Sequence, residues 1–280
     1  MKGLLGLVFA VVVLAGCAGE PRPANFSGLV DIGNGRHLFL TCRGAGAPTV
    51  FIIPGKGSHA AAWRVVVSAV ATTTSVCAYD RPNTRRDGDY LSTPVPQPHS
   101  VAQAVSDVVK LVGAARLSTP MVVVAHSYGG LIADLLARTH PGLVSGLVLV
   151  DPTSEYLPRL GRAEQDARFD QAARTPAPDA DGEGFLADDA FATLRVAPPL
   201  PLPRMPAIVL SADVSRGDMG AGDYTKYQVH RANSLLAETL WTDNVIVGGS
   251  GHNMMLSRPS AVAAKTLAMV DWVRSGVRRR

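Results

Sequence analysis

The chain has 280 residues, of which 47% are apolar and 18% charged, so it can bury a large core and intrinsic disorder is excluded as its main state. Its 27 glycines and 20 prolines are too many for a helical bundle, and they lack the period of a collagen. The net charge of +4 is mild and the basic residues are scattered, apart from three terminal arginines, so no nucleic-acid partner is expected.

The sequence pattern at the N-terminus predicts a targeting segment that is not part of the fold. Lys2 precedes an unbroken apolar run over residues 3–16, which is too short for a comfortable transmembrane helix. The run ends in Leu14-Ala15-Gly16-Cys17, which resembles a bacterial lipobox. That resemblance implies a signal peptide over 1–16, acylation of Cys17 and a tether over 17–25. We expect an exported protein whose partner is membrane lipid, anchored outside the cytoplasm on the cell membrane or in the outer membrane. The alternative is an ordinary secretory signal with a chance cysteine.

From about residue 26 onward, apolar runs alternate with helix-like segments. The Gly33-Asn34-Gly35 turn predicts a hairpin between the first two strands. Ser100 followed by Gln103 forms a capping box that opens a helix ending near Val112. The predicted strands are 28–32, 37–42, 50–53, 75–79, 121–125, 146–150, 207–211 and 245–247, and the other predicted helices are 63–72, 131–138 and 259–273. This alternation predicts an α/β fold with a mostly parallel sheet of about eight strands and helices on both faces.

One stretch interrupts the alternation. Residues 153–206 are rich in charges, alanine, proline and glycine, and contain no buried strand. Because a structureless loop of this length is unlikely inside a compact domain, we predict a small helical cap inserted into a domain over 26–280. Its helices are expected around 162–174 and 188–194.

The sequence around Ser127 carries the first chemical signal. Ala125-His126-Ser127-Tyr128-Gly129 lies between a buried strand and a helix and resembles the nucleophile elbow G-x-S-x-G, with Ala125 in place of the first glycine. A serine there sits on a tight strand-to-helix turn, next to backbone donors of the helix N-terminus. The alternative is a tight turn with an incidental serine.

Two further loops follow predicted strands. His252 lies in Gly249-Ser250-Gly251-His252 after the last strand, where it can reach toward a serine. Ile53-Pro54-Gly55-Lys56-Gly57-Ser58 resembles the H-G-x-G loop that supplies an oxyanion donor, with Pro54 replacing histidine. The expected donors are the backbone amides of Lys56 and Tyr128.

Together these elements resemble the α/β-hydrolase fold family over about residues 25–273. Tyr79-Asp80-Arg81-Pro82 is also similar to the family's D-R-x-G turn. The family's strand order places the second strand beside the fourth, which implies that Cys42 and Cys77 lie on neighbouring strands and pair in a disulfide. Two buried thiols are the alternative.

The acid of the triad stays open between several aspartates. The family usually carries it after the seventh strand, where Asp213 is early for the spacing and Asp218 is late. A minority places it after the sixth strand, where Asp151 lies. We rank Asp213 slightly above Asp151 and Asp218 third. The acid would accept the Nδ1–H of His252 and fix its tautomer.

The resemblance implies a serine hydrolase of esters or related acyl compounds that works through an acyl-enzyme. No metal or cofactor is expected, since no clustered His/Cys ligand spacing occurs. The alternatives are perhydrolase or haloperoxidase-like activity, an aminopeptidase using Glu155, Glu164 and Asp166, or a non-catalytic surface binding lipoprotein. The substrate is expected to be a small acyl compound, and the oligomeric state is left open. Candidate apolar pocket walls are Trp63, Tyr128, Leu157 and Met254.

Overall fold

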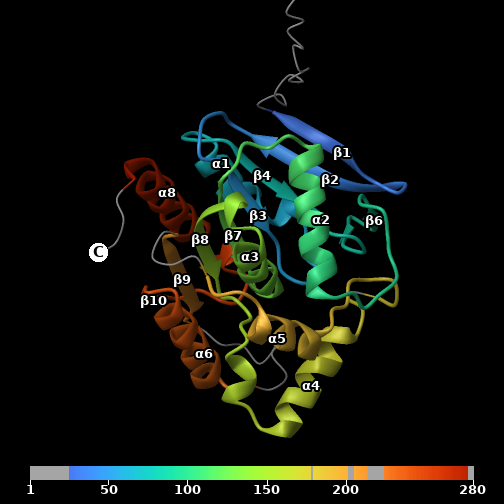
Figure 1. Ribbon diagram of the computed structural model, residues 1–280, viewed down its shortest axis with the longest axis vertical. Helices are drawn as coiled ribbons and strands as arrows, with labels where there is room; N and C mark the ends of the chain where they lie inside the picture. Colours follow the sequence, from blue (N-terminus) through green and yellow to red (C-terminus); the bar gives the residue numbers. More distant parts are fainter. Residues whose placement is uncertain (1–24, 178, 201–204, 214–223, 277–280) are drawn as a thin grey trace, which may run out of the picture.

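A computed structural model describes residues 25–177, 179–200, 205–213 and 224–276, and its centre is one eight-stranded sheet (Figure 1). The strand order is β1-β2-β4-β3-β7-β8-β9-β10; β2 runs antiparallel to both β1 and β4, and every other neighbouring pair is parallel. The predicted mostly parallel sheet of eight strands is confirmed. The strands are β1 (Phe26–Gly33), β2 (Arg36–Arg43), β3 (Val50–Ile53), β4 (Val76–Tyr79), β7 (Met121–His126), β8 (Val144–Val150), β9 (Ala207–Ala212) and β10 (Asn244–Val247).

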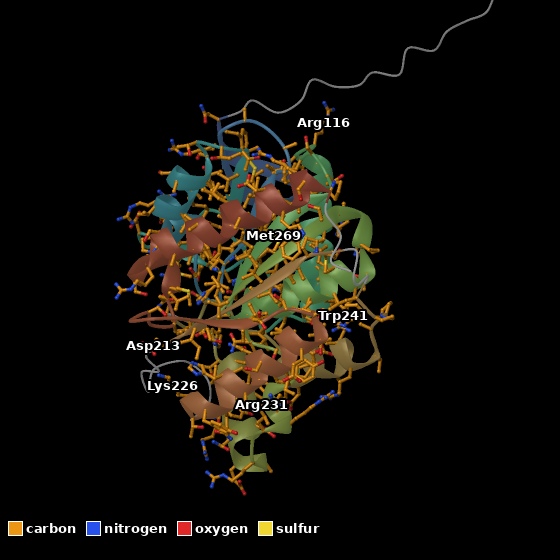
Figure 2. All side chains as sticks on the ribbon, turned by 90° about the vertical axis from the view of Figure 1, so that its left-hand side faces the viewer. Arg116, Asp213, Lys226, Arg231, Trp241 and Met269 are labelled. Carbon is orange, nitrogen blue, oxygen red and sulfur yellow. A yellow bond between two sulfur atoms is a disulfide. The ribbon has the colours of Figure 1, made fainter. Side chains whose placement is uncertain are left out.

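Helices cover both faces of the sheet, as continuous apolar runs in its central strands require. One core lies beneath α1 (Arg64–Val70) and α8 (Pro259–Ser275), where Trp63 and Met269 are fully buried. Figure 2 shows Met269 on α8 over the middle of the sheet. The other core lies beneath α2 (Val101–Ala114), α3 (Tyr128–Thr139) and α6 (Lys226–Thr239). The two cores hold the carboxyl ends of the parallel strands at one edge of the sheet.

The expected cysteine pair lies where the family's strand order implied. Cys42 on β2 and Cys77 on β4 are register partners of an antiparallel pair, and they form a disulfide. Both side chains are buried. Cys17 lies outside the described residues.

The predicted cap segment (residues 153–206) carries two helices, α4 (Ala163–Arg174) and α5 (Ala187–Val196), close to their expected positions. They lie together at the end of the molecule away from β1 and β2 (Figure 1). Each begins with acidic residues in its first turn, which favours the helix N-terminus.

Several elements were not expected from the sequence, among them three short 3-10 helices at Ala60–Trp63, Pro141–Leu143 and Leu157–Arg159. The others are α6, the small hairpin of β5 (Arg85–Arg86) and β6 (Asp89–Tyr90), and the short α7 (Met254–Ser257) that precedes α8. Among the described residues, no helix is both long and apolar enough to span a membrane.

Candidate active site

Ser127 occupies the sharp turn between β7 and α3. Its φ of 50° and ψ of −122° are strained for a side chain other than glycine, and such strain is typical of functional turns. The turn forces small neighbours: a Cβ at Gly129 would collide with the backbone oxygen of Ile53, and one at Gly130 with Pro152. The local sequence therefore holds Ser127 above the edge of the sheet, as a nucleophile elbow requires.

His252 faces the same site from the loop after β10. Its Nδ1 is 2.7 Å from Oδ2 of Asp151, which lies at the end of β8 and is almost fully buried. The other carboxylate oxygen, Oδ1, accepts a hydrogen bond from the Ala212 N–H at 3.0 Å. Both oxygens of Asp151 are thus engaged, and the contact with Nδ1 leaves Nε2 of His252 as the nitrogen available to other groups.

Asp213, ranked first from the sequence, is not the residue that contacts the imidazole. It accepts a hydrogen bond from the Gly249 N–H at 2.8 Å, and Lys226 lies 3.4 Å away. Figure 2 shows Asp213 and Lys226 together at the surface. The Gly249 N–H and then Lys226 lower the pKa of Asp213. Asp213 thus holds the start of the loop that carries His252, whereas Asp151, ranked second from the sequence, contacts the imidazole. Asp218, the third candidate, lies outside the described residues.

The loop of residues 54–58 (the 54–58 loop) runs beside Ser127. A Cβ at Gly55 would lie 3.2 Å from Cβ of Ser127, so the backbone passes directly by the serine. The backbone N–H groups of Lys56 and Tyr128 donate to no other residue in the described part of the chain. Two free backbone donors next to a serine are the groups that an oxyanion hole would need.

The side chain of Lys56 has a structural partner of its own. Its Nζ donates to the carbonyl oxygens of Ala172 at 2.6 Å and Thr175 at 2.7 Å, at the C-terminal end of α4. Burial lowers the pKa of Lys56, against the opposing effect of Glu183. The ammonium group of Lys56 therefore caps the C-terminal end of α4, where a positive charge is favourable.

A cavity of about 330 Å³ joins these groups, and Ser127, His252, Asp151, Lys56 and Tyr128 all line it. Of the expected apolar walls, Tyr128 and Leu157 line the cavity, whereas Trp63 and Met254 are fully buried elsewhere. The remaining apolar wall comes from the cap segment and α6: Phe169, Ala172, Ala173, Ala177, Phe185, Val229 and Ala232.

His126 was not singled out from the sequence, yet it contacts the backbone of His252. Its Nε2 donates to the carbonyl oxygen of His252 at 2.9 Å, and the two rings lie 4.6 Å apart. Burial, and next the charge of His252, lowers the pKa of His126 well below its usual value. A neutral ring with its proton on Nε2 is the form that can donate to a carbonyl.

The acidic residues that an aminopeptidase would need lie outside the cavity. They are Glu155, Glu164 and Asp166. Glu155 contacts Arg138, and Asp166 contacts Tyr224. In the described ranges, no group of three or more His, Cys, Asp or Glu side chains is arranged to hold a metal ion.

The chain belongs to the alpha/beta hydrolase family, whose model matches residues 50–265. It is 30% identical over 118 residues to a protein of Agrobacterium fabrum named putative carbamate hydrolase RutD, covering 42% of this chain and 43% of that protein. The chain spans less than half the length of the curated relatives it matches.

Solved structures share the fold across nearly the whole chain. A thermophilic esterase from Thermogutta terrifontis matches with a TM-score of 0.62 and 16% identity, over 90% of this chain and 98% of that one. A putative lipase from Acinetobacter baumannii matches with a TM-score of 0.61 and 19% identity, over 91% and 93%. The family match and these structural similarities agree on the fold.

Proposed function

We propose that the protein hydrolyses esters, or related acyl compounds, through a covalent acyl-enzyme on Ser127. The observation that carries this proposal is that Ser127 and His252 line one cavity while Asp151 holds Nδ1 of His252 at 2.7 Å. These residues come from loops after β7, β8 and β10, so the geometry depends on the whole sheet.

The mechanism follows from these positions. Nε2 of His252 accepts the Ser127 proton as Oγ attacks the substrate carbonyl. The negative charge on the tetrahedral oxygen is stabilised by the N–H groups of Lys56 and Tyr128. His252 then protonates the leaving group, and water repeats the same steps on the acyl-enzyme. Asp151 keeps the imidazole in the tautomer that has its lone pair on Nε2.

The cavity favours a small acyl group. Its volume of about 330 Å³ is at the lower end of the range for ligand sites, and its wall is largely apolar. Carbamates are the second candidate substrate class, favoured by the similarity to proteins named putative carbamate hydrolase.

The test is a series of 4-nitrophenyl esters from acetate to decanoate, with a 4-nitrophenyl carbamate as a separate arm. We expect kcat/KM to be highest for short chains and activity to vanish in Ser127→Ala and His252→Ala. Phe169→Ala should move the optimum to longer chains, because Phe169 forms part of the cap-side wall. Activity that persists in Ser127→Ala would contradict the proposal.

We also propose that the protein is exported and lipid-anchored through Cys17. The Leu14-Ala15-Gly16-Cys17 sequence supports this, and so does a disulfide between Cys42 and Cys77, because disulfides persist in oxidising compartments. Expression of Cys17→Ser in a bacterial host tests it: the wild type should fractionate with membranes and the variant should not. Equal membrane association of both would refute the anchor.

A further inference from the structure

A buried ion pair joins the main domain to the cap segment next to the 54–58 loop. Nε of Arg81 is 2.5 Å from Oε1 of Glu183, and Nη2 is 3.0 Å from Oε2. Neither side chain is more than 1% exposed. The two residues are 102 positions apart in sequence. The pair therefore forms only when the cap segment is packed against the main domain, an arrangement that we call the seated cap segment.

The same guanidinium holds two backbone carbonyls of the 54–58 loop. Nη1 of Arg81 donates to Pro54 O at 2.6 Å, and Nη2 donates to Gly55 O at 2.5 Å. In a trans peptide the C=O and N–H point in opposite directions. Since the Gly55 carbonyl faces Arg81, the N–H of Lys56 in the same peptide unit faces away from Arg81. That N–H is one of the two oxyanion donors of the proposed function.

Glu183 and Lys56 hold the loop from the cap side. Oε2 of Glu183 accepts a hydrogen bond from the Gly57 N–H at 2.7 Å. Nζ of Lys56 is bound to two carbonyl oxygens at the end of α4. The cap segment therefore fixes Lys56 and Gly57, while Arg81 fixes Gly55 on the other side of the Lys56 N–H.

Arg81 also reaches the second donor residue. Its guanidinium carbon lies 5.3 Å from the centre of the Tyr128 ring, and that ring stacks on Phe185 of the cap segment at 3.9 Å. The Arg81 guanidinium thus contacts the peptide unit that contains the Lys56 N–H and also the side chain of Tyr128, the residue that carries the second N–H donor.

We propose that Arg81 and Glu183 are positioning residues that aim the Lys56 N–H at the reacting carbonyl, so that a seated cap segment is a condition for turnover. The proposal rests on the proposed function, because it assigns these residues a role in the same oxyanion hole. It extends that function by making the cap segment a part of the catalytic geometry and not only a wall of the cavity.

The alternative is that the ion pair serves stability alone, and the two roles can be separated. A buried ion pair replaced by apolar side chains of similar volume often leaves a protein as stable as before. The double variant Arg81→Met/Glu183→Leu can therefore keep the fold while it loses the three hydrogen bonds that Arg81 and Glu183 make to the 54–58 loop. Glu183→Gln is the milder change, because it keeps an oxygen for the Gly57 N–H but leaves the charge of Arg81 unpaired.

The experiment measures kcat and KM for 4-nitrophenyl acetate together with Tm, at a temperature well below the Tm of each variant. We expect kcat to fall about 10- to 100-fold in both variants, with KM changed by less than about threefold, as for a misplaced transition-state contact. The matched control is Asp107→Asn, which breaks the Arg36–Asp107 ion pair between α2 and β2, away from the cavity. It should lower Tm and leave kcat unchanged.

Wild-type kcat in the folded double variant or in Glu183→Gln would overturn the proposal, since the loop would then keep its geometry without the ion pair. A failure of the proposed function itself looks different, because wild-type protein would then hydrolyse no ester and Ser127→Ala would change nothing.

A second, independent observation concerns Asn233, which lines the cavity from α6 and is 1% exposed. Its amide orientation follows from a chain of hydrogen bonds. Nδ2 of Asn244 donates to the carbonyl oxygen of His230, so Oδ1 of Asn244 must accept from Oγ of Ser211 at 2.8 Å. Ser211 has then used its one proton and accepts from Nδ2 of Asn233 at 2.9 Å.

This chain leaves Oδ1 of Asn233 as a buried acceptor with no partner in the described part of the protein. A buried acceptor without a partner costs about 1–3 kcal/mol, so a ligand that supplies a donor is favoured there. We infer that the substrates include acyl compounds that carry an O–H or N–H donor for Asn233, such as hydroxyacyl esters.

The test compares 4-nitrophenyl ω-hydroxyalkanoates with alkanoates of matched length, from butyryl to heptanoyl. In Asn233→Leu the ratio of kcat/KM for hydroxyacyl over alkyl ester should fall about five- to tenfold at the preferred length. Val229→Leu, on the same helix and cavity wall, should leave the ratio unchanged. A ratio that does not change in Asn233→Leu overturns the inference, whereas loss of alkyl-ester hydrolysis in the wild type would be a failure of the proposed function.

Discussion

Asp151→Asn changes one atom of the candidate triad, and the structure dictates how the new amide must sit. Oδ1 of Asp151 accepts from the Ala212 N–H, and an amide NH₂ placed there would face another donor. The amide oxygen therefore stays at Ala212, and the NH₂ faces Nδ1 of His252. The imidazole must then present a lone pair on Nδ1 and carry its proton on Nε2, where it can no longer accept the proton of Ser127.

The magnitude follows from this tautomer. A wrong tautomer in a serine triad lowers kcat about 10³- to 10⁴-fold, which corresponds to about 4–5 kcal/mol in the activation free energy. Hydrolysis of 4-nitrophenyl acetate under saturating substrate measures kcat, and Tm shows whether the fold is kept.

The matched control is Asp213→Asn. The Asp213 side chain is 40% exposed and contacts Lys226 and the Gly249 N–H rather than His252, so kcat should stay within about threefold of the wild type. A larger loss of kcat in Asp213→Asn than in Asp151→Asn would refute the reasoning.

Three further results are expected. Burial, and next the carboxyl of a neighbouring aspartate, raises the pKa of Glu155 to about 7. The folded protein then holds this proton more tightly than the unfolded chain, whose glutamate pKa is about 4.3, so this group's contribution to the unfolding free energy falls as the pH rises from about 5 to 7. In urea titrations, Glu155→Gln should therefore gain stability relative to the wild type across that range, and a difference independent of pH would speak against it. Cys42→Ala/Cys77→Ala should lose about 3–4 kcal/mol of unfolding free energy, since the disulfide closes a loop with a sequence separation of 35, while kcat below Tm stays unchanged. Gly129→Ala should abolish activity or folding, because its Cβ would collide with a backbone oxygen of β3, and a soluble, fully active variant would contradict the packing of the elbow.

The central fold was predictable because its signals are local. Buried parallel strands appear as continuous apolar runs, and β3, β7 and β8 lie where such runs occur. The positions of Ser127 and His252 at one cavity were predictable for a similar reason, since each stands in a short motif directly after a strand. Helix α6 was missed because it is polar on average, and only its capping box at Thr225 and Gln228 marks its start.

The acid and the positioning residues depend on long-range geometry. Asp151 and Asp213 both follow the carboxyl ends of neighbouring strands, and only the path of the loop after β10 decides which carboxylate meets the imidazole. Glu183 lies in a charged, irregular part of the cap segment, and its partner Arg81 is 102 residues away. Sequence spacing carries no signal for such a pair.

The most direct test of the account is the site of covalent modification by a fluorophosphonate. The intact protein should gain the mass of one phosphonyl group, and peptide mapping should place that group on Oγ of Ser127, with no adduct on Ser127→Ala. A well-folded wild type that gains no mass, or that carries the adduct on another residue, would contradict the claim that Ser127 is the nucleophile.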